Sequence, residues 1–400
     1  MDLPSPMPDP MLSVYLDHAA TTPLDEAALE AMLPYLREHY GNASSVHALG
    51  RRARFAVEDA RERVAAVLGA EPGEIVFTSG GTEADNAALR GVLTSPDRRG
   101  PGLVTSAVEH EAVLQPAHAL DAEGHPVTVL SPQPSGAVTP EQVEAAITGD
   151  TGLVSLMFVN NELGTLNPVR EIAAICRERG VPFHTDAVQA AGLYPLDVND
   201  LGVDLLSLSA HKVYGPKGAG VLYVRSGTPF EPLMRGGSQE RKRRGGTENV
   251  AAVVGLAEAL ERAQQSAEAE HTRLRALRDR LAAAIREPFR DAVRFNTPLG
   301  SDDVETAPHI LNVSFPPMNG RAVDGEMLLL GLDLAGIHAS SGSACTSGAV
   351  EPSHVLRALG VPRETANATV RLSLGRSTTE ADVDFAAEHL VAVVGRQRGG

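Results

Sequence analysis

Cysteine, lysine and tryptophan are all scarce in this chain of 400 residues, which has two cysteines, three lysines and no tryptophan. The two cysteines, Cys176 and Cys345, are too few for a disulfide framework or for a four-cysteine zinc site. Basic residues are outnumbered by acidic ones, and the formal net charge is −16. A nucleic-acid backbone requires a basic surface, so direct nucleic-acid binding is not expected.

Long apolar runs are absent too. None approaches the roughly 20 residues that a membrane helix needs, so no membrane partner is expected. The first residues, "MDLPSPMPDPM", are rich in proline and have neither a basic region nor an apolar stretch. We expect a loose tail there, not a signal peptide, and therefore a location in the reducing cytoplasm.

The scarcity of lysine makes each of the three residues, Lys212, Lys217 and Lys242, a candidate for a chemical role. Arginine can replace lysine in solubility or ion pairing. It cannot replace a primary amine that must lose its proton and form a covalent bond. Lys212 follows a histidine in "SLSAHKVYGPKG", between a hydrophobic run and a glycine-rich turn.

Short β-rich runs alternate with helix-like stretches between residues 74 and 224. The runs are EIVFTS, GLVTSA, PVTVL, GLVSLMFV, VPFHTD, DLLSLS and GVLYV. The intervening stretches include TEADNAALRGVL and VREIAAICRERG. Apolar strands spaced by helices predict an α/β fold with a mainly parallel sheet. Ligands bind beyond the carboxyl ends of such strands, so functional residues should follow each one.

A long helical pattern over residues 249–286 follows, and we expect it to connect two domains. The runs HILNVSF and TVRLSL and a closing helix predict a smaller α+β domain after it. We expect an N-terminal segment, residues 1–24, that joins the small domain. The large domain would span residues 25–268 and the small domain residues 269–400, with a cysteine loop at 340–352.

Several expected strand ends carry polar residues whose roles are ambiguous when each is taken alone. "SGGTEADN", with Thr82, is either an anion cradle at a helix start or only a tight turn. His110 could stack on a flat ring or move protons, or could merely begin a helix. Asn161 could grip a carboxylate or simply belong to a loop.

The last two strand ends add a carboxylate and an amine. Asp186 ends one run, with Gln189 three residues later, and Ser209, His211 and Lys212 follow another. Pyridoxal phosphate needs a lysine, an acidic partner for its ring nitrogen and an anion pocket. The five strand ends together therefore predict a pyridoxal-phosphate enzyme.

At these residues the chain resembles the cysteine desulfurases, in the aminotransferase class V branch of fold type I pyridoxal-phosphate enzymes. The resemblance runs from residue 15 to about residue 384. Its motifs are YLDHAATTP, GNASSVHALG, FTSGGTEADN, VNNELG, HTDAVQ, SAHKVYGPKG, RRGGTEN, SSGSACTSG and RLSLGR. The cysteine segment resembles that of the first group of these enzymes.

The resemblance implies a role for each residue that matches a motif. Lys212 would hold the cofactor covalently, and His110 would stack on its ring and handle protons. Asp186 would be the partner of the ring nitrogen, and Gln189 the donor to the ring hydroxyl. The implied phosphate ligands are Thr82, Ser209 and His211.

Three further assignments concern the neighbouring subunit and the substrate. Thr247 would complete the phosphate site of a second subunit, which implies a homodimer. Asn161 and Arg371 would bind the substrate carboxylate. Cys345 would take the sulfur, while Cys176 is expected to face the core.

The implied reaction converts L-cysteine to L-alanine and leaves a persulfide on Cys345. A sulfur-acceptor protein would then take the sulfur for iron–sulfur cluster assembly or another sulfur transfer. A selenocysteine lyase would share nearly every residue named. A non-catalytic interaction protein that retains the fold is a further alternative. The identity of the acceptor remains open because the sequence ends at VVGRQRGG, without the longer tail of the housekeeping iron–sulfur members.

Overall fold

A seven-stranded sheet dominates the computed structural model, which describes residues 13–301, 303–342 and 352–399. Strand β8 is antiparallel to both of its neighbours, and every other adjacent pair in this sheet is parallel. The predicted mainly parallel α/β fold is therefore confirmed. In spatial order the strands are β2 (Ile75–Thr78), β8 (Gly220–Val224), β7 (Leu205–Ser209), β6 (Phe183–Asp186), β5 (Thr151–Ser155), β3 (Gly102–Ser106) and β4 (Val127–Leu130).

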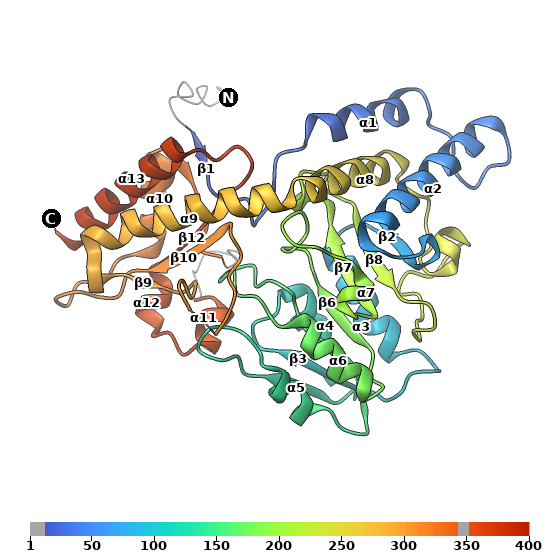
Figure 1. Cartoon of the computed structure of the whole chain (residues 1–400), viewed down its shortest axis with the longest axis horizontal. Helices are drawn as coiled ribbons and strands as arrows, with labels where there is room; N and C mark the ends of the chain where they lie inside the picture. The colour runs from blue at the N-terminus through green and yellow to red at the C-terminus, as the bar shows by residue number, and fades with distance from the viewer. Residues whose placement is uncertain (1–12, 302, 343–351, 400) are drawn as a thin grey trace, which may run out of the picture.

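Helices cover both faces of this sheet, which is why most of its strands are apolar throughout (Figure 1). One face packs on α3 (Gly81–Leu93) and α4 (Glu111–Ala122). The other face packs on α2 (Ala48–Leu68), α5 (Pro140–Ala146), α6 (Val169–Glu178), α7 (Val198–Leu201) and α8 (Val250–Gln265). Helix α1 (Glu26–Arg37) lies against α8.

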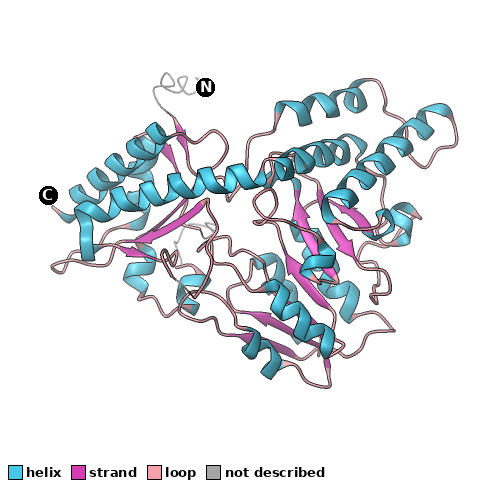
Figure 2. Cartoon of the chain, in the orientation of Figure 1, coloured by secondary structure: helices cyan, strands magenta, loops and turns pink. Residues whose placement is uncertain are grey.

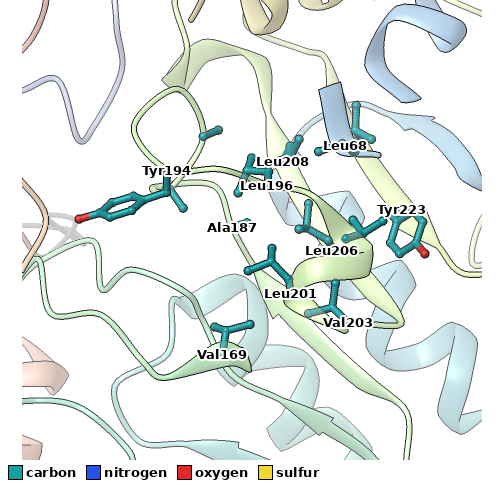
Figure 3. Packing of buried hydrophobic residues seen from close by; sticks show 14 of the residues in the cluster. Leu68, Val169, Ala187, Tyr194, Leu196, Leu201, Val203, Leu206, Leu208 and Tyr223 are labelled. Carbon is teal, nitrogen blue, oxygen red and sulfur yellow. The ribbon is translucent and has the colours of Figure 1, made fainter. Parts of the chain in front are cut away.

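Alternate side chains of one strand enter opposite cores. Leu205 packs with the α3 and α4 side, whereas Leu206 and Leu208 pack with the α2 and α8 side (Figure 3). Leu206 is fully buried. Its replacement by alanine would cost about 2–5 kcal/mol of unfolding free energy.

A second core forms around a three-stranded antiparallel sheet (Figure 2). The sheet consists of β12 (Thr369–Ser373), β10 (Ile310–Ser314) and β9 (Arg294–Phe295). Around it lie α9 (Ala267–Phe289), α10 (Gly325–Leu334) and α13 (Glu380–Arg398). The short helices α11 (His354–Ala358) and α12 (Arg363–Asn367) lie in the same C-terminal half of the sequence.

The N-terminal segment joins this second core. Strand β1 (Val14–Tyr15) pairs in parallel with β11 (Ile337–His338), and Val14 and Leu16 are buried among its apolar side chains. From there the chain passes to α1, where the Asp25 side chain caps the helix by accepting from Ala27 N. Residues 17–22 thereby lie between the two cores.

Two sequence expectations need adjustment. The helical pattern at 249–286 is not one helix, because the chain breaks at Ser266 between α8 and α9. Helix α8 belongs to the first core and α9 to the second, and α9 runs from one to the other (Figure 1). The run GLVSLMFV leaves the sheet at Ser155. The division into domains at residue 268 stays a prediction.

Candidate active site

The carboxyl ends of β2, β3, β5, β6 and β7 supply most of the predicted site residues from one edge of the large sheet. Thr82 lies in the first turn of α3, and His110 is the N-cap of α4. Asn161 follows β5, Asp186 ends β6, and Ser209 ends β7. Lys212 comes one short helical turn after Ser209.

The amine of Lys212 is held by the N-terminal segment. Its Nζ donates to the carbonyl oxygens of Ala19 at 2.5 Å and Ala20 at 2.8 Å. Burial, helped by the charge of Arg371, lowers the pKa of Lys212 to about 8. At pH 7 the Lys212 amine is then neutral in about one molecule in ten. Lys217 and Lys242 are exposed, whereas Lys212 is not.

The carboxyl of Asp186 is buried without a cation partner among the described residues. Only its Oδ1 accepts a hydrogen bond from them, from Val188 N at 2.9 Å. Burial raises the pKa of Asp186, while electrostatic interactions with His110 and Lys212 offset part of the rise. A buried carboxylate needs a cationic or hydrogen-bonding partner, so this site favours a ligand that brings one.

Two further buried carboxyls near Asp186 were missed by sequence reasoning. Burial raises the pKa of both Asp85 and Glu109 well above the usual value, and the charge of Asp186 adds to each shift. His184 lies 3.7 Å from Asp85, but burial lowers the pKa of His184 to about 3. The histidine is therefore neutral and forms no ion pair. Burial therefore favours the neutral form of Asp85 and Glu109, and no sequence signal separated them from helix and turn residues.

An anion cradle is present at the start of α3. The backbone N–H groups of Gly81, Thr82 and Glu83 donate to none of the described residues. Gly80 has φ 149°, a conformation that favours glycine. It also packs tightly on β8, because a Cβ on Gly220 would lie 2.6 Å from the Gly80 Cα. Free N–H groups at a helix start suit an anionic ligand group.

Ser209 stands beside this cradle at the end of β7, and His211 follows it by two residues. A Cβ on Gly81 would lie 3.6 Å from the Ser209 Cβ, which places the serine next to the helix start. Burial, with the charge of Lys212, lowers the pKa of His211 to about 4. The ring is therefore neutral, and its Nδ1 lies 3.1 Å from the Thr21 hydroxyl. The cradle thus gains the Ser209 side chain, and a neutral His211 ring lies next to Lys212 in the chain.

His110 is fixed by its capping role. Its Nδ1 accepts a hydrogen bond from Ala112 N at 3.1 Å. Burial lowers the pKa of His110, so the ring is neutral and its proton lies on Nε2. In this form Nε2 is a donor. The predicted role in taking a proton therefore requires the other neutral tautomer, with the proton on Nδ1 and Nε2 free to accept.

Gln189 is oriented by two contacts. Its Nε2 donates to the Ala19 carbonyl at 2.9 Å, the same oxygen that accepts from Lys212. Its Oε1 lies 3.4 Å from His309 Nε2. Gln189 and Lys212 thus share one acceptor, and the contact of Gln189 with His309 was not predicted.

Arg371 brings the second core to the site. One terminal nitrogen donates to the Asn161 carbonyl at 2.9 Å, and the other donates to the Asp17 carboxylate at 2.9 Å and the Ser340 hydroxyl at 3.0 Å. Its Nε is buried and has no partner among the described residues. Asn161 contacts Arg371 through the main chain. Asp17 was missed, although it lies in the quoted motif YLDHAATTP.

Thr247 is exposed in this chain. Its role at the phosphate site of a neighbouring subunit stays a prediction. The adjacent basic run, residues 241–244, makes ion pairs within the chain. Arg241 pairs with Glu58 at 3.0 Å, and Arg244 pairs with Glu83 at 2.9 Å. These pairs tie the Thr247 loop to α2 and to the start of α3.

Of the two cysteines, Cys176 lies among the described residues. Cys345 lies outside the described residues. Cys176 is buried in α6, and burial raises the pKa of its thiol to about 12. Its predicted core position is confirmed, and its thiol is unreactive. Across the ranges that the structure describes, no helix combines the length and the apolar character that a membrane crossing requires.

A parallel α/β sheet with a lysine, a carboxylate and an anion cradle along one edge is the arrangement of a lysine-dependent enzyme. The aminotransferase class-V family matches residues 14–385. The chain belongs to this family, and the predicted relationship to cysteine desulfurases is confirmed.

Individual relatives cover nearly the whole chain. Cysteine desulfurase IscS of Dictyoglomus turgidum is 46% identical over 385 residues, which span 96% of this chain and 95% of the relative. A solved NifS-like protein superposes with a TM-score of 0.87 at 37% identity, covering 96% of this chain and all of the other. SspA, solved in complex with cysteine, gives a TM-score of 0.77 at 36% identity, covering 90% and 99% of the two chains.

Proposed function

We propose that this protein is a cysteine desulfurase that removes sulfur from L-cysteine, releases L-alanine and retains the sulfur as a persulfide on Cys345. The observation that carries the proposal is that Lys212, an amine with a lowered pKa, and the buried carboxyl of Asp186, which has no cation partner among the described residues, follow neighbouring strands at one sheet edge. The cysteine desulfurase relatives, similar over nearly the full chain, support the choice of reaction.

The residues at the sheet edge suit pyridoxal 5′-phosphate. The free N–H groups of the α3 start, Thr82, Ser209 and His211 would hold its phosphate. Asp186, which lacks a cation partner in the described ranges, would pair with the protonated ring nitrogen, and Gln189 would donate to the ring hydroxyl. When bound, this group supplies an electron sink for the electrons of the substrate's Cα–H bond.

Lys212 is the base of the proposed reaction. Its lowered pKa makes the neutral amine accessible near neutral pH, so Nζ can take the Cα proton of the substrate. The carbonyls of Ala19 and Ala20 then accept hydrogen bonds from the ammonium that results. The N-terminal segment thereby stabilises the ammonium form of Lys212.

Arg371 is the proposed anchor for the substrate carboxylate. Its terminal nitrogens are already directed to Asp17, Ser340 and Asn161, which fix the plane of the guanidinium. The unpartnered Nε remains for a carboxylate oxygen. Asn161 lies against the guanidinium and would add its side-chain amide.

Cys345 is the proposed sulfur acceptor. Its thiolate attacks the substrate sulfur, an S–S bond forms, and the substrate C–S bond breaks as alanine departs. With its ring proton moved to Nδ1, His110 would accept the proton of the Cys345 thiol on Nε2 and then pass that proton to the departing carbon.

The assembly and the fate of the sulfur are finer parts of the same proposal. We place Thr247 at the phosphate site of a second copy in a homodimer, and the enzyme in the cytoplasm. The persulfide would pass to a sulfur-acceptor protein, an iron–sulfur scaffold or another sulfur carrier. The selenocysteine lyase alternative is separated by the relative rates on cysteine and selenocysteine.

Mass spectrometry of the intact holoenzyme after brief exposure to cysteine tests the proposal. We expect one added sulfur on the peptide that holds Cys345 and one alanine for each sulfur transferred. The Cys176 peptide is the internal control and should stay unmodified, because its thiol is buried. Alanine formation without sulfur on Cys345 under non-reducing conditions would overturn the mechanism.

A further inference from the structure

A small cavity of about 40 Å³ lies beside Lys212, where the end of β7 meets the start of α9 and the end of β12. Its lining includes His18, Gln189, Lys212 and His309. The cavity borders the proposed cofactor site, since it shares Lys212 and Gln189 with it, but neither Thr82 nor Asp186 is part of its lining. Its size is sufficient for at least one water molecule, which needs roughly 10–15 Å³.

His18 presents a lone pair without a partner. The ring Nδ1 lies 3.2 Å from the Ser373 carbonyl oxygen. Because a carbonyl only accepts, Nδ1 carries the proton of this neutral ring. Burial lowers the pKa of His18, which favours that neutral form. Its Nε2 is then an acceptor, buried and without a hydrogen-bond partner in the described ranges.

His309 presents a second lone pair of the same kind. Gln189 must direct its amide nitrogen to the Ala19 carbonyl, so its Oε1 faces His309 Nε2. That nitrogen therefore carries the ring proton. Burial, with the neighbouring His18, lowers the pKa of His309 to about 3, so the ring is neutral. Its Nδ1 is a buried acceptor with no partner among the residues described.

Lys212 supplies the matching donor. A protonated lysine has three N–H groups, and two of them are used by the Ala19 and Ala20 carbonyls. No acceptor for the third is found among the described residues. The charge of Arg371 opposes the ammonium form, whereas Asp186 and Asp17 favour it. Besides Lys212, the charged residues that line the cavity itself are Glu270 and Arg376.

We propose that this cavity binds an ordered water molecule that donates to His18 Nε2 and His309 Nδ1 and accepts the third hydrogen bond of the Lys212 ammonium. Such a water has given both hydrogens to the histidines, so it presents only lone pairs to the lysine. It therefore stabilises the ammonium over the neutral amine. His18 and His309 are positioning residues that act on Lys212 through the water.

The inference deepens the proposed function, because it rests on Lys212 as the base. Once Lys212 has taken the substrate proton, the water and two carbonyls would satisfy all three of its donors. The site would thus hold the lysine as a cation until it returns its proton. The water site and the pKa of Lys212 can both be measured without turnover, so a failed desulfurase reaction would leave this test intact.

The first measurement is a high-resolution crystal structure of the wild-type holoenzyme. We expect a water within hydrogen-bond distance of both His18 Nε2 and His309 Nδ1. A dry cavity in a structure that resolves other buried waters would overturn the proposal. So would electron density for the opposite orientation of the Gln189 amide, because His309 would then have no lone pair to offer.

The second measurement is the acylation rate of Lys212 against pH, followed by peptide mapping of the full chain purified without cofactor. His18→Leu removes one acceptor, so Lys212 should lose its proton at lower pH and react about threefold or more faster at pH 7. His389→Leu, on α13 and away from the cavity, is the control. If His18→Leu fails to fold, His309→Leu is read in the same assay. Unchanged acylation in a folded variant would refute the role of the water.

Discussion

The guanidinium of Arg371, on β12 of the second core, is paired with the carboxylate of Asp17 at 2.9 Å. This pair ties the small sheet to the N-terminal segment that also holds the amine of Lys212. Because Asp17 and Ser340 occupy one terminal nitrogen and Asn161 the other, the orientation of the guanidinium is fixed before a substrate arrives. Only Nε is left without a partner in the described part of the chain.

Replacing Arg371 by lysine should weaken cysteine binding more than it slows turnover. Lysine keeps the charge but cannot reach Asp17, Ser340, Asn161 and a carboxylate together. We expect KM for cysteine to rise about tenfold or more, the equivalent of one lost charge-assisted hydrogen bond. Steady-state kinetics give the split between KM and kcat. Arg396→Lys near the end of α13 is the matched control, and an equal KM in both variants would exclude Arg371 as the anchor.

Lys212→Ala should abolish the borohydride-reducible bond to pyridoxal phosphate, whereas Lys217→Ala and Lys242→Ala should retain it. Only Lys212 combines burial, a lowered pKa and a place at the sheet edge. Borohydride reduction followed by peptide mapping identifies the labelled lysine. A label on Lys217 in the wild-type protein would show the assignment to be wrong.

The pH dependence of cofactor attachment follows from the same lysine. Attachment needs the neutral amine, and burial places its pKa at about 8. The attachment rate should therefore rise with pH through a midpoint near 8, well below the usual lysine value. Stopped-flow absorbance at a series of pH values measures it. The same lysine affects the free energy of unfolding. The unfolded chain binds this proton more tightly than the folded chain, so the contribution of Lys212 to the free energy of unfolding should increase between pH 8 and about 10.4.

Most of the site was predictable because parallel strands bring their carboxyl ends together. The sequence therefore located Lys212, Asp186, Thr82 and His110 from the strand pattern. Partners supplied by distant segments were not predictable. Asp17 reaches Arg371 only after β1 pairs with β11, and no local pattern encodes that pairing.

The missed buried acids and the helix break have related causes. Asp85 occupies an α3 position that in sequence looks like any solvated helix carboxylate, and only the packed sheet buries it. The helical pattern at 249–286 was read as one element. Propensity does not mark the break at Ser266, where the chain leaves the first core for the second.

His110 should separate a capping role from a chemical role. Asparagine is a good N-cap and cannot transfer a proton near neutral pH, whereas alanine loses both functions. His110→Asn should keep its unfolding free energy, and His110→Ala should lose about 1 kcal/mol. Both should reduce kcat by about 10²–10⁴-fold, as the loss of a general acid–base group does. Thermal unfolding and alanine release measure the two effects. Near-normal kcat in His110→Asn would restrict the residue to capping.

Composite active sites can be tested by mixing two inactive variants. If Thr247 serves the phosphate site of the neighbour, a mixed dimer of Lys212→Ala and Thr247→Ala subunits contains one site free of both changes. Activity should recover toward a quarter of the wild-type value per subunit in a statistical one-to-one mixture. Half of the dimers are then mixed, and each has one of its two sites intact. Subunit exchange is checked with differently tagged wild-type chains, and no recovery after proven exchange would contradict shared sites.

Cys345→Ser distinguishes sulfur transfer from other chemistry of this family. Serine is nearly the same size as cysteine, so the folded protein and cofactor binding should persist. Its hydroxyl is far less acidic and a much weaker nucleophile toward sulfur, so sulfide release from cysteine in the presence of a reductant should fall to background. Cys176→Ser is the matched control, since the Cys176 thiol is buried in α6 and has no proposed role in the reaction. If folded, it should keep most activity.

Absorbance spectra on adding cysteine would show that Cys345→Ser still binds its substrate, because Lys212, Asp186 and Arg371 are unchanged. Full sulfide release by a folded Cys345→Ser protein would mean that sulfur leaves without passing through this thiol.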